Sequence, residues 1–139
     1  MKSHSQRKYR RAAFSLVELV VVVLIIGILA AVAAPRMFDT AGNARDAATK
    51  ASLGIVRDAI ELFRSQNGSY PLATNLPTAI KPFMRGTFPS VQTTLATNQN
   101  NSVATSTVDP IAVVAGTAGW AYNQTTGEFV VNDTRCISW

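Results

Sequence analysis

Hydrophobic residues are concentrated near the start of the chain, where an apolar run covers residues 14–34. Only Ser15 and Glu18 interrupt it with polar side chains. About 20 apolar residues, each rising about 1.5 Å in a helix, match the bilayer hydrocarbon core of about 30 Å. The run and the residue that follows it, Pro35, therefore predict a transmembrane helix over residues 14–35.

Pro35 sets what happens at the far end of this helix. A proline removes one backbone donor and crowds the preceding turn. We expect a kink at Pro35 if the helix continues beyond it. The alternative is that Pro35 simply ends the transmembrane helix.

The pattern after Pro35 is that of a second helical segment, over residues 36–66. Apolar residues recur three or four positions apart, which predicts an amphipathic helix. They are Met37, Ala41, Ala44, Ala48, Ala51, Ile55, Ala59 and Leu62, and the stripe is widened toward its end by Phe38, Val56, Ile60 and Phe63. On the opposite face, the spacing of Arg57 and Glu61 predicts an ion pair. Asn67-Gly68 is a stop signal for the helix.

The apolar stripe changes in size along this segment. Its first half is mostly alanine, which suits close helix–helix approach between subunits, although a plain solvent-exposed spacer helix has the same pattern. Its second half is bulky, so we expect residues 55–63 to pack on a sheet.

The short apolar runs and turn signals of residues 67–139 predict a small globular head. A short helix is expected within residues 76–84, and strands at 103–108 and 111–115. The segments 119–122 and 128–132 flank a turn that contains Gly127, which predicts a hairpin. Its core candidates are Trp120, Tyr122, Phe129 and Val131. The fold class expected is α+β: a long N-terminal helix packed on a small antiparallel sheet.

Charge is distributed unevenly along the 139 residues. Five of the 13 basic residues precede Phe14, and the other eight are balanced by eight acidic residues. The neutral body argues against nucleic-acid binding. A basic segment before an apolar run places the N-terminus in the cytoplasm and the head across the membrane. A solvated basic tail is the alternative.

The sequence offers few candidates for catalytic or metal-binding residues. The chain has one histidine, His4, and one cysteine, Cys136, so no internal disulfide forms. Asp109 and Asp133 are isolated, whereas calcium needs six to eight oxygen ligands. We therefore expect no enzyme activity, no metal and no cofactor.

Glu18 is the most informative residue because a carboxylate within lipid is costly. An acid near a helix end can instead reach the interface and have no role. The apolar run contains no positive partner for it. A cut directly before Phe14 would create an α-amino group four residues from Glu18. In a bundle of identical helices, Glu18 of one copy would then meet the amino terminus of another.

These residues resemble a known family. The segment Ala13-Phe14-Ser15-Leu16-Val17-Glu18, its basic leader and its distant Pro35 are similar to the prepilin-type cleavage and methylation segment of type IV pilins and type II secretion pseudopilins. The resemblance implies cleavage between Ala13 and Phe14, N-methylation of Phe14, and neutralisation of a neighbour's amine by Glu18. Ala13 replaces the usual glycine of the family.

The resemblance implies a membrane-stored structural subunit. Residues 1–13 would be a cleaved leader, 14–35 the assembly helix, 36–66 the stalk and 67–139 the head. The partners expected are copies of the chain or related subunits, a prepilin peptidase and N-methyltransferase, an inner-membrane assembly platform and lipid. The location expected is the bacterial inner membrane, single-pass with a periplasmic head, and then a periplasmic or extracellular filament.

Two other functions fit the same pattern. A monomeric membrane-tethered periplasmic binding module would have the same apolar helix but no use for Glu18. A secreted soluble domain would be cut after Ala33, in the Ala31-Val32-Ala33 segment, and would begin at Ala34.

Overall fold

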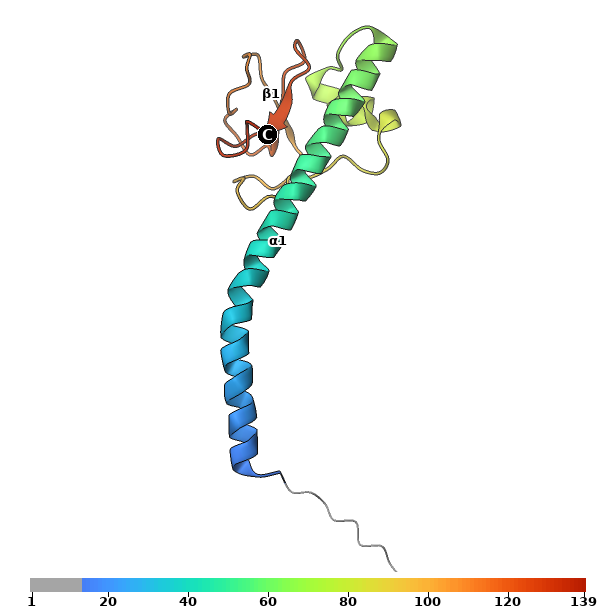
Figure 1. Cartoon of the computed structure of the whole chain (residues 1–139). Coiled ribbons are helices and arrows are strands. Elements are labelled where there is room, and N and C mark those ends of the chain that lie inside the picture. The colour runs from blue at the N-terminus through green and yellow to red at the C-terminus, as the bar shows by residue number, and fades with distance from the viewer. Residues whose placement is uncertain (1–13) are drawn as a thin grey trace, which may run out of the picture. The chain divides into compact units, whose positions relative to one another are not determined.

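The computed structural model describes residues 14–139, so Ala13 and the basic leader lie outside the described residues. The elements are α1 (Leu16–Asn67), η1 (Ala73–Asn75), α2 (Leu76–Ala79), η2 (Lys81–Phe83), β1 (Val103–Thr105), β2 (Trp120–Tyr122) and β3 (Phe129–Val131) (Figure 1). The chain divides into two compact units, of which the first ends at Phe38 and the second covers Asp39–Trp139.

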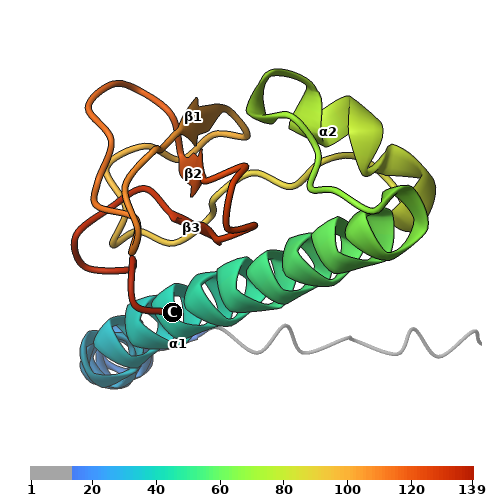
Figure 2. The ribbon, with the colours of Figure 1, turned by 90° about the horizontal axis from the view of Figure 1, so that it is seen from above.

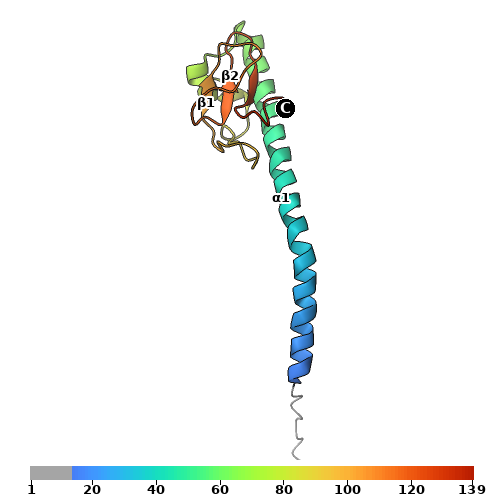
Figure 3. The ribbon, with the colours of Figure 1, turned by 90° about the vertical axis from the view of Figure 1, so that its left-hand side faces the viewer.

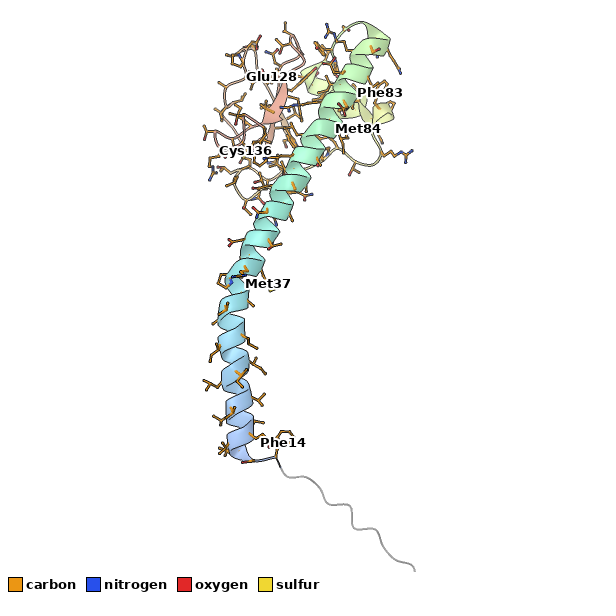
Figure 4. All side chains as sticks on the ribbon, in the orientation of Figure 1. Phe14, Met37, Phe83, Met84, Glu128 and Cys136 are labelled. Atoms are coloured by element: carbon orange, nitrogen blue, oxygen red, sulfur yellow. The ribbon has the colours of Figure 1, made fainter. Side chains whose placement is uncertain are left out.

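The first unit contains the apolar part of α1. An 18-residue window in this helix has a mean hydropathy of 3.1 and no buried residue, so α1 is long and apolar enough to cross a membrane. Side chains such as Met37 project freely from it in Figure 4. Pro35 lies inside α1, so the alternative that it ends the helix is wrong. The kink at Pro35 stays a prediction.

In the second unit, the rest of α1 packs on the head. All three strands lie on one side of this helix in Figure 2. The helix buries Thr49, Leu53, Val56, Ala59 and Ile60. These positions, three or four apart, form one face. The helix ends at Asn67, and Gly68, in a left-handed conformation with φ +74°, donates its N–H to the Arg64 carbonyl at 2.8 Å.

The predicted apolar stripe of α1 packs on the head only along its widened edge, where Val56, Ala59 and Ile60 are buried. Ile55 and Leu62, expected in the core with them, are 53% and 50% exposed. The helix has two apolar faces about 120° apart, at 3.6 residues per turn. The head covers the face with Leu53, Val56 and Ile60.

The sheet has the order β1-β2-β3, and β3 lies nearest α1 in Figure 3. The hairpin prediction is confirmed: β2 and β3 are antiparallel, with Trp120 opposite Val131. The prediction of a wholly antiparallel sheet is wrong, because β1 runs parallel to β2. Residues 106–119 supply the long crossover that a parallel pair requires. The α+β class is unchanged.

The strand predicted at residues 111–115 is absent, and this segment is a loop over the outer face of the sheet. The Asn132 side chain makes the hydrogen bonds that a neighbouring strand would have made to this segment. Its oxygen accepts a hydrogen bond from the Val114 N–H at 2.8 Å, and its nitrogen donates to the Val114 carbonyl at 2.9 Å. Ile111 packs on Ala121 and Val130, so both faces of the sheet are buried. Asn98 and Asn100 hold the carbonyls of residues 116–118 in the same way.

The four predicted core residues are all buried. The Trp120 and Phe129 rings stack with centroids 5.1 Å apart. Each polar atom in this core has a partner: the Trp120 indole donates to the Pro89 carbonyl at 2.9 Å, and the Tyr122 hydroxyl donates to the Pro71 carbonyl at 3.0 Å. Burial raises the pKa of Tyr122. The short helix predicted within residues 76–84 is present as α2 and η2.

Arg57 joins α1 to the C-terminal part of the head. Its Nε donates to the Phe129 carbonyl at 2.9 Å and its guanidinium to the Trp139 backbone oxygen at 2.8 Å. Burial lowers the pKa of Arg57, and Glu128 opposes that shift. The predicted ion pair of Arg57 with Glu61 is therefore wrong; Glu61 lies 3.9 Å from Arg64 instead.

We expect Arg57→Met to lower the free energy of unfolding by about 2–3 kcal/mol, because two partly buried backbone oxygens lose a charged donor. Urea unfolding of the detergent-solubilised chain, followed by tryptophan fluorescence, measures this. The control is Arg64→Met, since the Arg64 side chain is 52% exposed and a surface pair contributes about 1 kcal/mol or less. Equal effects of the two substitutions would contradict the role given to Arg57.

Gly127 gives a second test of the head. It has φ +80°, and a Cβ built there would overlap the Tyr70 ring, whereas a Cβ on Gly68 would meet nothing. We expect Gly68→Ala to cost about 1–2 kcal/mol for the left-handed backbone alone. Gly127→Ala should cost about 1–3 kcal/mol more, from overpacking against Tyr70. The same urea titration checks the order, and replacing Tyr70 by alanine should remove most of the difference.

Candidate assembly site

Phe14 and Glu18 are brought together at the start of α1. Phe14 and Ser15 precede the first helical residue, and the Leu19 N–H donates to the Ser15 carbonyl at 3.2 Å. Glu18 lies in the first turn. The positive end of the helix dipole favours a carboxylate at this position. A charge carried by the Phe14 nitrogen would therefore lie within about one turn of the Glu18 carboxylate.

Within residues 14–139, the Glu18 side chain makes no hydrogen bond or ion pair. The next basic residue along the helix is Arg36, about 27 Å further at 1.5 Å per residue. That distance exceeds the Debye length of about 8 Å at physiological salt. Neutralisation of Glu18 by a basic side chain among the described residues of the same copy is therefore ruled out by distance.

The surface around Glu18 is almost entirely apolar. From Phe14 to Val32, the large hydrophobic side chains are 46–79% exposed. Soluble monomers rarely expose contiguous apolar patches larger than a few hundred Å². This surface needs lipid or other helices to cover it.

The remaining predicted site residues fall in two places. Pro35 lies in the same helix, 17 residues beyond Glu18, and Ala13 is outside the described residues. Sequence reasoning assigned Ile55 and Leu62 to the core together with Val56 and Ile60, but the structure leaves Ile55 and Leu62 exposed.

The spacing of Leu53, Val56 and Ile60 was the signal that could have separated the two faces.

The head has few groups suited to chemistry. Among residues 14–139, no cluster of three or more His, Cys, Asp or Glu could hold a metal ion. Asp133 is used structurally: it accepts from Arg135 at 3.0 Å and from the Thr97 N–H at 2.9 Å. The Arg135 hydrogen bonds hold the pKa of Asp133 well below its usual range. Burial raises the pKa of Cys136, so its thiol is protonated at neutral pH.

Comparison with known proteins agrees with this geometry. Residues 8–34 match the prokaryotic N-terminal methylation motif. Over 97 residues the chain is 33% identical to the type IV narrow pilus major component PilA5 of Thermus thermophilus, a match that covers 70% of this chain and 78% of that protein.

Two further relatives are type II secretion system core protein G. The chain is 29% identical to the Pseudomonas aeruginosa protein over 65 residues (47% of this chain), and 28% identical to the Pectobacterium carotovorum protein over 69 residues (50%). These matches span somewhat less than half of each relative, 46% and 44%. No solved structure matches the chain. The methylation motif at an exposed apolar helix, together with the long match to PilA5, shows that the chain belongs to the family of type IV pilins and type II secretion pseudopilins.

Proposed function

We propose that this chain is a structural subunit of a type IV pilus-like or type II secretion pseudopilus filament, stored in a membrane and assembled through its N-terminal helix. The observation that carries the proposal is Glu18, a carboxylate without a side-chain partner among residues 14–139 of its own copy, in the first turn of an uncovered apolar helix. A membrane-tethered binding module has the same anchor but gains nothing from this carboxylate.

Processing would create the partner that Glu18 lacks. Hydrolysis of the bond between Ala13 and Phe14 by a prepilin peptidase frees the Phe14 amine, which is then N-methylated. The amine stays positively charged after one methylation. Two unit charges 4 Å apart attract by about 4 kcal/mol at an effective dielectric constant of 20. The ammonium of one copy therefore offsets the cost of holding Glu18 of another in an apolar bundle.

Assembly would also keep the apolar surface covered throughout. Lipid covers residues 14–34 in the stored form, and helices of other copies cover them in the filament. Contact between different patches of neighbouring copies does not close on itself and produces a fibre. The stored form would cross the bacterial inner membrane once, with its N-terminus cytoplasmic and its head periplasmic, and would meet the assembly platform there.

We expect Glu18→Gln to stop filament formation while leaving membrane insertion intact, because glutamine keeps the shape but loses the charge. The measurement is the amount of sheared or sedimented filament relative to the membrane-bound pool. Glu18→Asp, which keeps the charge, should restore part of the yield. Normal filaments from Glu18→Gln would overturn the proposal, and a tethered module would show no change in its membrane pool or in its binding.

The N-terminus of the mature protein gives an independent test. Intact mass and N-terminal sequencing should find N-methyl-Phe at position 14. Ala13→Gly should be processed at least as fast as the natural chain, and Ala13→Phe should remain uncut, because a small residue is needed at the cleavage site. A mature chain that begins at Met1 or at Ala34 would contradict the assignment of the leader.

A further inference from the structure

The strand β1 has one unpaired edge. It is the outer strand of the sheet, on the side away from α1 in Figure 3. The Ser102 carbonyl accepts a hydrogen bond from β2 at 3.0 Å, and the Ser106 N–H donates one to β2 at 2.8 Å. In a parallel pair of this register, the backbone groups of Val103 and Thr105 point away from β2. Within residues 14–139 these groups have no hydrogen-bond partner.

The segment of residues 111–115 carries a second set of unpaired backbone groups. Its first four residues run without a turn or bend, and Val114 is bonded to Asn132 through both its N–H and its carbonyl. In an extended chain the next residue on either side points its backbone groups the opposite way. The N–H and carbonyl of Val113 therefore point away from Asn132. They have no partner among the described residues, and Val113 is 41% exposed.

The composition of both segments suits the addition of a strand. No charged residue lies within residues 86–108 or 110–127. Many proteins protect an edge strand from pairing with lysine, proline or inward-pointing charges, and β1 has none of these. Val103, Thr105 and Val113 are β-branched, and such side chains fit a pleated surface. Neither segment carries a charge or a proline that would oppose pairing between them.

The unpaired groups of the two segments match in spacing. Val103 and Thr105 are two residues apart, and so are Val113 and Ala115, which is also exposed. In antiparallel pairing, Thr105 opposite Val113 and Val103 opposite Ala115 would exchange four hydrogen bonds. The chain therefore carries both halves of one contact. Because the two halves are different patches of the head, pairing between copies does not close and can continue along a fibre.

We propose that β1 binds residues 112–115 of a second copy as a fourth strand, and that this contact joins the heads of neighbouring subunits. The inference rests on the proposed function, because assembly through α1 holds the heads of neighbouring copies at a high effective concentration. A strand of three residues offers few hydrogen bonds, so the contact forms in the filament and not between free chains. The sequence pattern that predicts a strand at 111–115 is then satisfied between copies.

Cross-linking tests which segments meet. Chains with Thr105→Cys and chains with Val113→Cys are assembled together and treated with a short bismaleimide. The natural Cys136 is buried and does not compete. The control replaces Val113→Cys by Leu72→Cys, because Leu72 is 59% exposed and lies outside both segments. We expect the 105–113 product to exceed the 105–72 product at least tenfold in filaments, and neither product in detergent.

Equal amounts of the two products would overturn the inference. If such filaments still depend on Glu18, the proposed function stays intact. If no filaments form from the natural chain, both the inference and the proposed function are overturned.

Hydrogen exchange tests the backbone contact without a cross-linker. In filaments, the amides of Val103 and Thr105 should exchange at least tenfold more slowly than in detergent. Val113→Pro removes an outward N–H, whereas Val113→Ala also shortens the side chain but keeps that N–H. The first variant should lose most of the protection in β1, and the second should keep it. Tryptophan fluorescence in detergent checks that both heads are folded. Equal protection in the two variants, or none in natural filaments, would overturn the added strand.

Discussion

The central physical constraint is that α1 carries more apolar surface than the rest of the chain covers. The head buries one face of its second half, including Leu53, Val56 and Ile60. The apolar run from Phe14 and the face with Ile55 and Leu62 stay exposed. An exposed apolar surface of this extent needs lipid or other helices to cover it. The Glu18 carboxylate near the start of α1 adds a second requirement, because lipid offers it no counter-charge.

Local sequence predicted the parts of the fold that depend on local physics. The apolar run, the stop at Asn67-Gly68 and the hairpin around Gly127 follow from composition and from turn preferences. The buried face of α1 followed only in part, because Val56 and Ile60 were expected in the core but Ile55 and Leu62, which are exposed, were expected there with them. Ile111 is β-branched, as strand residues often are, yet its segment is a loop. The backbone N–H and carbonyl of Val114 in this segment are bonded to the Asn132 side-chain amide instead of to a neighbouring strand.

The candidate site was predicted in its residues but not in its surroundings. The spacing of Phe14 and Glu18 is visible in the sequence. The structure adds that Phe14 directly precedes a helix, that Glu18 lies in its first turn, and that no basic side chain among the described residues is nearby. Arg57 was predicted to pair with Glu61 because they are four residues apart. In the structure the guanidinium reaches Phe129 and Trp139, contacts between residues more than 70 positions apart that no local pattern encodes.

The loops over the sheet are attached by side-chain amides of Asn98, Asn100 and Asn132 instead of by a strand ladder. Strand pairing fixes the length and register of both strands, whereas a single side-chain amide fixes only the point at which the loop contacts the sheet. Changes in loop length between these points that keep Ile111 on Ala121 and Val130 need not alter the hairpin or α1. The surface loops of the head can therefore vary more readily than the helix through which the proposed filament would assemble.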